Sequence, residues 1–214
     1  MKYKAILFDM DGTLFNSEYI AKLAWMEYGR LNNLPITDEF YLTLIGRSRQ
    51  SAKVMFDKYM PAHFNEDEAY AYAKEYTTKY KSMHGPLPKT NLPKLFTTLK
   101  DKGYKLAIVS SSAQSTIDLN LSFENLSAYF DTLINGNMVS NGKPAPDIYL
   151  LAANQLQVKP NECLVIEDSK NGILSGHAAG MDVVMVVDMV QPDDEIKKCC
   201  LKIYDHLDDI LEII

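Results

Sequence analysis

Short apolar segments recur along this 214-residue chain, and they limit the folds it can adopt more than any other feature. They contain no regular alternation of polar and apolar residues, so each is typical of a strand that is buried on both faces. They cover residues 4–8, 105–109, 132–134, 162–166 and 183–187. Helix-like or loop segments separate most of them, and that order predicts an α/β fold built on a parallel sheet.

The region from residue 16 to residue 85 has a different pattern, because its apolar residues fall at helical spacing and no convincing strand occurs. The pattern predicts helices at residues 20–31, 51–59 and 66–83. Gly85 and the prolines that follow it mark the return to the first pattern. We therefore predict two domains, an α/β catalytic core of residues 1–15 and 86–214 and a helical insert of residues 16–85.

Charge and cysteine content restrict the partners and the compartment. The formal net charge of -6 provides no positive field for a nucleic-acid backbone, so we expect no nucleic-acid partner. Three cysteines fit neither a disulfide framework nor a zinc cluster, which indicates a reducing compartment. The N-terminus has no long apolar segment and no cleavage site. We expect a cytoplasmic protein without membrane contact, and a monomer because no long apolar stripe is left over.

Two carboxylates, Asp9 and Asp11, stand where the first apolar segment ends, and Gly12 after them permits a sharp turn. The carboxyl ends of parallel strands form the ligand crevice of such a sheet, so both side chains are expected to face a substrate. The alternatives are a calcium loop and a simple turn. A helical calcium loop needs a third oxygen ligand before its glycine and a distal glutamate, and neither spacing is met.

Ser110 and Lys143 are two further candidate site residues. Ser110 ends the segment 105–109, and its hydroxyl group can donate to an oxyanion, although a serine after a strand is also common turn chemistry. Lys143 lies in a proline-rich loop before a helix predicted at residues 147–155. The prolines restrict the backbone and fix the direction of the ammonium group, while an ordinary exposed loop is the alternative.

Glu167 and Asp168 follow the segment 162–166, and Ser169 after them can cap the next helix. Acidic residues also stabilise the start of a helix, so capping competes with metal binding as an explanation. All these groups follow predicted parallel strands, in one order along the chain, and together they form a phosphoryl-transfer site. Crowded carboxylates repel each other unless a cation neutralises them, and Mg²⁺ would do so.

This set of motifs resembles the haloacid dehalogenase superfamily, whose four motifs match Asp9-Met-Asp11-Gly-Thr, Ser110, Lys143 and Glu167-Asp168. The resemblance covers nearly the whole chain. It implies a Rossmann-like core with an inserted four-helix-bundle cap of the β-phosphoglucomutase-like type, which closes over the substrate.

The resemblance also implies the roles of these residues. Asp9 would attack phosphorus and become an aspartyl phosphate, and Asp11 would protonate the leaving oxygen and later activate water. Mg²⁺ would be held by the carboxylates of Asp9 and Asp168 and by the backbone carbonyl of Asp11, with Glu167 reaching it through water. Ser110 and Lys143 would hold the transferring phosphoryl oxygens.

Substrate contacts follow from the same resemblance. Ser17 near one hinge and Arg49 in the segment 46–49 match positions that touch substrate in the β-phosphoglucomutase-like branch, and Arg49 could clamp a second anionic group. We also expect Ser111, beside Ser110, to extend the set of hydrogen-bond donors.

The expected function is hydrolysis of a small phosphomonoester, a sugar phosphate or a similar phosphorylated metabolite, by a Mg²⁺-dependent phosphatase. A β-phosphoglucomutase-type phosphomutase is the alternative, favoured by Arg49 and disfavoured by Ala21 and Ile45, which stand where the mutase carries a cap histidine and a cap lysine. Dehalogenation is disfavoured because true dehalogenases lack the aspartate seen here as Asp11. A catalytically silent binding protein is a further alternative, but it has no need of all the motif residues together.

Overall fold

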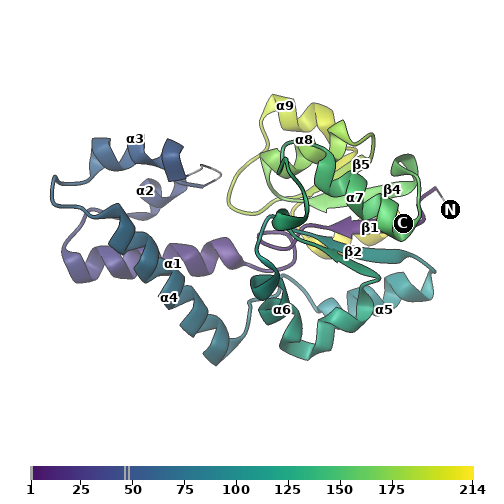
Figure 1. Ribbon diagram of the computed structural model, residues 1–214, viewed down its shortest axis with the longest axis horizontal. Coiled ribbons are helices and arrows are strands. Elements are labelled where there is room, and N and C mark those ends of the chain that lie inside the picture. Colours follow the sequence, from purple (N-terminus) through teal and green to yellow (C-terminus); the bar gives the residue numbers. More distant parts are fainter. Residues whose placement is uncertain (1, 46, 48) are drawn as a thin grey trace. The chain divides into compact units, whose positions relative to one another are not determined.

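The computed structural model describes residues 2–45, 47 and 49–214, so Gly46 and Ser48 of the predicted substrate-binding segment lie outside the described residues. The chain divides into two compact units (Figure 1). The core unit comprises residues 1–16 and 86–214, and the cap unit comprises residues 17–85. The predicted boundary after residue 15 lies one residue before this division.

The described residues of the core unit form a six-stranded sheet in the order β3-β2-β1-β4-β5-β6, in which every neighbouring pair is parallel. The strands are β1 (Ala5–Phe8), β2 (Lys105–Val109), β3 (Thr132–Ile134), β4 (Cys163–Glu167), β5 (Asp182–Val186) and β6 (Lys202–Tyr204). All residues of β1 and β4 are buried, as expected of central strands that are covered on both faces.

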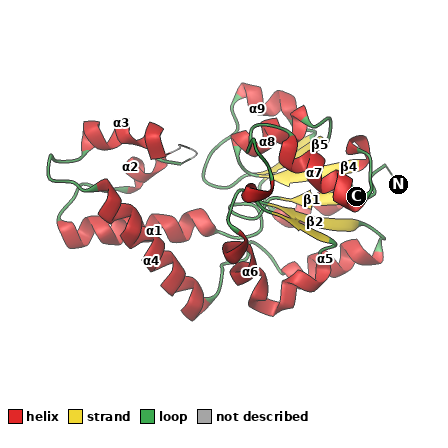
Figure 2. Cartoon of the chain, viewed as in Figure 1, coloured by secondary structure: helices red, strands yellow, loops and turns green. Residues whose placement is uncertain are grey.

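Helices cover both faces of this sheet (Figure 2). The α-helices are α5 (Leu92–Asp101), α6 (Gln114–Ser122), α7 (Asp147–Leu156), α8 (Lys170–Ala178) and α9 (Asp194–Cys199). The 3-10 helices are η1 (Phe123–Tyr129), η2 (Gly136–Met138), η3 (Pro160–Glu162) and η4 (Leu207–Glu212). One apolar cluster joins the sheet to α5, α6 and η4, and a second joins its other face to α7, α8 and α9.

The strand order explains where a ligand can bind. The chain runs outward from β1 through β2 to β3, and then returns to the other side of β1 with β4 and continues to β6. The order therefore reverses between β1 and β4. In open α/β sheets, ligands bind in the crevice outside the carboxyl ends of the strands at such a switch point. Residues that follow β1 and β4 lie at this crevice.

The cap unit is helical, with α1 (Ser17–Asn32), α2 (Asp38–Leu42), α3 (Arg49–Tyr59) and α4 (Glu66–His84). Its interior is aromatic. Trp25 of α1 stacks on Phe56 of α3 with ring centroids 5.6 Å apart, and Phe40 of α2 packs against the same phenylalanine at 6.0 Å. Offset and tilted aromatic pairs of this kind stabilise a small helical unit beyond their area burial.

The structure confirms the predicted parallel α/β fold and adds elements that the sequence pattern did not indicate. The segment β6 is a short edge strand of three residues, one of them a lysine, and α2 has only five residues. Across the described ranges, no helix is long and apolar enough to cross a membrane.

Candidate active site

The loop after β1 carries the predicted nucleophile. The backbone N–H of Asp9 donates to the carbonyl of Ile166 on β4, which fixes the loop at the sheet edge. Gly12 has a φ of +87°, and a Cβ there would lie 2.2 Å from Asp168 Oδ2. Only glycine therefore allows this turn to pass so close to the Asp168 carboxylate. Thr13, the next residue, donates to Asp168 Oδ1 at 2.9 Å.

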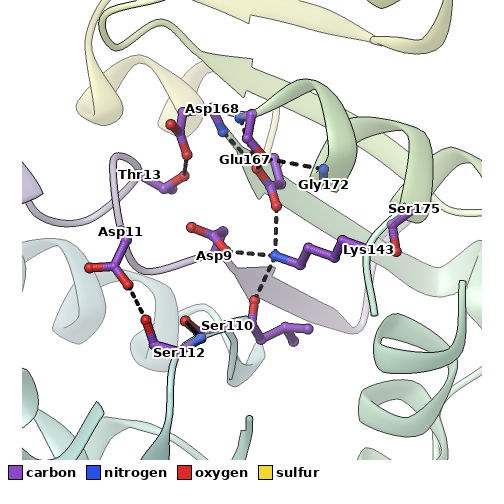
Figure 3. Close-up of polar contacts among 12 residues, drawn as sticks. Asp9, Asp11, Thr13, Ser110, Ser112, Lys143, Glu167, Asp168, Gly172 and Ser175 are labelled. Atoms are coloured by element: carbon purple, nitrogen blue, oxygen red, sulfur yellow. Dashed lines mark hydrogen bonds and ion pairs between the residues drawn. The ribbon is translucent and has the colours of Figure 1, made fainter. Parts of the chain in front are cut away.

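Lys143 is buried at the centre of the site (Figure 3). Its ammonium group lies 2.6 Å from Asp9 Oδ1, 2.7 Å from Glu167 Oε1 and 3.0 Å from the carbonyl of Val109. An ammonium group has three N–H donors, so these contacts use all of them. A phosphoryl oxygen can bind Lys143 only by replacing one of these acceptors.

Glu167, at the end of β4, is fully buried and accepts hydrogen bonds on both oxygens. Besides Lys143, the hydroxyl of Tyr149 donates to Oε1, at 3.1 Å. Oε2 accepts from the N–H groups of Asp168 and Ser169 and from the Ser169 hydroxyl, at 2.9–3.0 Å. A carboxylate offers about four lone-pair sites, so the five donors around Glu167 leave none free.

The start of α8 is shaped around this carboxylate. Ser169 caps the helix by accepting from the N–H of Gly172 at 3.1 Å, as its position in the sequence predicted. A Cβ on Gly172 would lie 1.5 Å from Glu167 Oε1, so this glycine leaves the space that the buried carboxylate occupies.

The electrostatics of the site are dominated by burial and by like charges. Burial raises the pKa of Asp9 to about 8, against the attraction of Lys143 and with the repulsion of Glu167. Burial, with Glu167 and Asp9 nearby, raises the pKa of Asp168 well above its usual range. Burial alone would lower the pKa of Lys143, but the charges of Asp9 and Glu167 hold it well above its ordinary value.

A divalent cation fits this donor set. Carboxylate oxygens of Asp9, Glu167 and Asp168 lie within 4.8 Å of one another, and because five donors already engage Glu167, Asp9 and Asp168 are the ones that can bind a cation directly. Three ionised carboxylates against the single ammonium of Lys143 leave two excess negative charges, which one divalent cation neutralises. Hard divalent cations prefer oxygen ligands of this kind. The site can therefore hold a metal ion between the ends of β1 and β4.

The structure brings Ser112 to Asp11. The Ser112 hydroxyl donates to Asp11 Oδ2 at 2.7 Å, and the Ser112 N–H donates to the buried Ser110 Oγ at 3.0 Å. These contacts link the Asp11 carboxylate to the residues that follow β2. Ser111, predicted to bind substrate, is exposed between the two serines and has no such contact with Asp11 among the described residues.

The two other predicted substrate contacts belong to the cap unit. Ser17 begins α1. Arg49 begins α3, and its Nε lies 2.9 Å from Glu66 Oε1 while its Nη2 contacts Asp67 Oδ1. The guanidinium group also lies 4.6 Å from the centre of the Tyr70 ring. The positive charge of Arg49 is thus already matched within the cap unit.

Tyr149 of α7 is a site residue that the motifs did not indicate. It is fully buried, its hydroxyl binds Glu167, and its ring centre lies 5.0 Å from the Lys143 ammonium. A sequence signal existed, because Tyr149 lies in the first turn of the helix that follows Lys143, among the buried positions of that helix. The residue orients Lys143 and Glu167 together.

Comparisons with known proteins agree with this geometry. The family model described as haloacid dehalogenase-like hydrolase matches residues 6–186. The phosphorylated carbohydrates phosphatase of Thermotoga maritima is 30% identical over 182 residues, which cover 84% of this chain and 82% of that protein. A Thermotoga maritima structure assigned as a β-phosphoglucomutase has a TM-score of 0.81 at 24% identity, covering 98% of this chain and 97% of that one.

One relative is much longer than this chain. The protein Suppressor of Quenching 1, chloroplastic, of Arabidopsis thaliana is 31% identical over 188 residues. The match covers 86% of this chain but 18% of that protein.

Proposed function

Because this chain belongs to the haloacid dehalogenase-like hydrolase family, we propose that it is a magnesium-dependent phosphatase that hydrolyses a small phosphomonoester through an aspartyl phosphate on Asp9. A sugar phosphate is the proposed substrate class, supported by the similarity to the phosphorylated carbohydrates phosphatase of Thermotoga maritima. The observation that carries the proposal is the convergence of Asp9, Lys143 and two further carboxylates at the switch point of the sheet.

In the first half of the reaction, a carboxylate oxygen of Asp9 attacks phosphorus while the bond from phosphorus to the ester oxygen breaks. Asp11 gives its proton to that leaving oxygen, so the alcohol departs neutral. The hydrogen bond from Ser112 holds the Asp11 carboxyl group in one orientation for this transfer. Asp9 is then an acyl phosphate.

In the second half, Asp11 takes a proton from a water molecule, and that water attacks phosphorus. The bond between phosphorus and Asp9 breaks, which releases inorganic phosphate and restores the carboxylate. Asp11 is protonated again and ready for the next substrate.

Lys143 acts first on the nucleophile. Its 2.6 Å contact with Asp9 Oδ1 orients the carboxylate before substrate arrives. As Asp9 bonds to phosphorus it loses its negative charge, and its hold on the ammonium group weakens. Lys143 can then turn a donor towards the phosphoryl oxygens, beside the Ser110 hydroxyl.

Asp9, Asp168 and the backbone carbonyl of Asp11 are the proposed direct ligands of the magnesium ion. When bound, magnesium neutralises the carboxylate cluster and screens the approach of the phosphate dianion. The elevated pKa values of Asp9 and Asp168 fit this arrangement, since a cation is what allows both groups to ionise in a buried site.

A phosphomutase of the β-phosphoglucomutase type is the second candidate. The fold of the solved structure assigned to that activity is shared by this chain. Arg49 was the cap residue that favoured a mutase, and it is paired with Glu66 and Asp67 within the cap unit. A mutase must also protect its phosphoenzyme from water, and the apolar Ala21 and Ile45 supply no polar cap contacts for that task.

We further propose that the protein acts as a monomer in the cytoplasm on a phosphorylated metabolite. Ser17, Arg49 and Ser111 remain proposed substrate contacts. To bind an anionic group of the substrate, the Arg49 guanidinium would have to leave its two acidic partners, Glu66 and Asp67.

Phosphate release from a panel of sugar phosphates and other phosphomonoesters, with magnesium present, tests the proposal. It is run beside Asp9→Asn and beside an assay for hexose-phosphate isomerisation. Release by the wild-type protein and its loss in Asp9→Asn are expected. Isomerisation with little release would instead establish the mutase.

A further inference from the structure

An ion pair outside the four motifs joins two segments of the core unit. Lys89 Nζ lies 2.8 Å from Asp188 Oδ1, and the two side chains are only 11% and 12% exposed. Surface ion pairs contribute little, but a pair that is this deeply buried constrains both side chains. The contact is therefore a fixed feature of the core.

Lys89 belongs to the segment through which the chain returns to the core unit. Its backbone N–H donates to the carbonyl of Leu14 at 2.9 Å, and Phe15 forms a β-bridge with Pro88. Leu14 lies in the loop that begins with Asp9. Lys89 thus connects the nucleophile loop, through its backbone, to Asp188, through its side chain.

Asp188 lies two residues beyond β5, the strand next to β4. In the register of these strands Glu167 is opposite Met185, so Asp168 and Asp188 leave the sheet at the same edge. The negative charge of Asp188 contributes to the raised pKa of Asp168, as expected of nearby like charges.

The second oxygen of Asp188 is buried and has no hydrogen-bond partner among the described residues. An unsatisfied buried acceptor is destabilising, and such groups usually bind a water molecule or a ligand. Glu167, by contrast, has both oxygens engaged by five donors and can accept from a further water only by losing one of them. Asp188 offers the free acceptor that Glu167 lacks.

We propose that Asp188 is a positioning residue of the cation site, whose free oxygen accepts a hydrogen bond from a water on the cation while Lys89 holds its other oxygen. The inference rests on the proposed magnesium-dependent function. Asp188 is outside the group of carboxylates whose oxygens lie within 4.8 Å of one another, so it acts through water and through its charge, not as a direct ligand.

The two members of the pair affect the cation in opposite directions. Asp188→Asn removes a negative charge, and with its one oxygen accepting from Lys89 it presents an NH2 donor where the free acceptor was. The Kd for magnesium should therefore rise about tenfold, within the range for residues that support metal ligands. Lys89→Met removes a nearby positive charge and frees the second Asp188 oxygen, so the Kd should fall. A purely structural ion pair would instead weaken cation binding in both variants, in step with stability.

Calorimetric titration of magnesium chloride into the cation-free full-length protein tests the proposal directly. The wild type, Asp188→Asn, Lys89→Met and the double variant are compared, with urea unfolding of each. Asp182→Asn is the matched control, because Asp182 begins the same strand β5 and pairs with Lys2 at the other end of the sheet. Its magnesium Kd should equal that of the wild type. The double variant has lost both charges, so its Kd should lie between those of the single variants. If Lys89→Met does not fold, the Kd of the double variant can still be compared with that of Asp188→Asn and should be lower.

An unchanged magnesium Kd in Asp188→Asn would overturn this inference, and so would weaker magnesium binding in both single variants. The proposed function would stand in either case, provided that the wild type releases phosphate. If the wild type bound no magnesium and released no phosphate, the proposed function would fail and the inference with it. A Kd raised in Asp188→Asn and lowered in Lys89→Met supports the assignment.

Discussion

The ammonium of Lys143 lies 2.6 Å from Asp9 Oδ1, so the proposed nucleophile is held by a buried cation before any substrate binds. The same ammonium holds Glu167 at 2.7 Å. One lysine therefore compensates two carboxylates that come from different strands, and it links the chemistry of the site to the stability of the core.

Lys143→Met should destabilise the cation-free protein by about 3–5 kcal/mol, because it leaves two buried carboxylates without the positive charge that compensates them. Urea unfolding measures the change. Lys100→Met is the control, since Lys100 pairs with Asp131 at a position where both side chains are 36% exposed. That substitution should change the free energy of unfolding by no more than about 1 kcal/mol. Equal effects of the two substitutions would argue against a central role for the buried pair.

Gly172→Ala should lower both stability and activity, because the new Cβ would occupy the position of the Glu167 carboxylate. Overpacking alone destabilises by about 1–3 kcal/mol, and displaced hydrogen bonds to Glu167 add to that. Gly142→Ala is the matched control, as a Cβ there meets no atom within 4 Å. It should stay within about 0.5 kcal/mol of the wild type in urea unfolding. A Gly172→Ala protein as stable as Gly142→Ala would contradict the tight fit around Glu167.

Ser112→Ala should reduce kcat about 10- to 100-fold with a smaller effect on KM, because Asp11 loses the hydrogen bond that orients it for proton transfer. Steady-state phosphate release measures both constants. Ser115→Ala, at an exposed position early in α6, is the control and should leave both unchanged. A change confined to KM would remove Ser112 from its positioning role and make it a substrate contact.

The free energy of unfolding should depend on pH through the ionisation of Asp131. Burial alone would raise the pKa of this carboxyl group, but the N–H of Leu106 and the ammonium of Lys100 outweigh burial and lower it. A depressed folded-state pKa stabilises the protein above the unfolded-state value, about 3.9, and the stabilisation is lost as pH falls through the folded-state pKa.

Asp131→Asn should therefore be less stable than the wild type at pH 7, and the difference should shrink as the pH is lowered below 4 or so. Urea unfolding of both proteins across this range checks the sign. A difference that grows towards low pH would show that the charge of Asp131 does not stabilise the fold.

The sheet could be predicted because its central strands are buried on both faces and so appear as unbroken apolar runs. The structure has those strands within a residue of the predicted positions, with β4 reaching Glu167 and β5 beginning at Asp182. The strand β6 could not be predicted in this way. It is a partly exposed edge strand of three residues that begins with a lysine, and its pairing with β5 is a tertiary contact.

The motif residues were recognisable because each follows a strand, and parallel strands bring their ends together. Asp9 and Glu167 meet for that reason, at the ends of the neighbouring strands β1 and β4. Lys143 reaches both from the loop before α7. The partners of the motif residues depend on tertiary packing that no local pattern records. Tyr149 beneath Lys143 and the acids that bind Arg49 are examples.

If Asp9 becomes an aspartyl phosphate during the reaction, that species can be trapped. Asp11→Asn can still be phosphorylated by an aryl phosphate, whose leaving group needs no proton, but it lacks the base that activates water. The variant is mixed with 4-nitrophenyl phosphate and magnesium, quenched and treated with borohydride, which reduces an acyl phosphate to an alcohol. Mass spectrometry should then find homoserine at position 9, and none when substrate is omitted. A burst of nitrophenolate without modification of residue 9 would contradict the account.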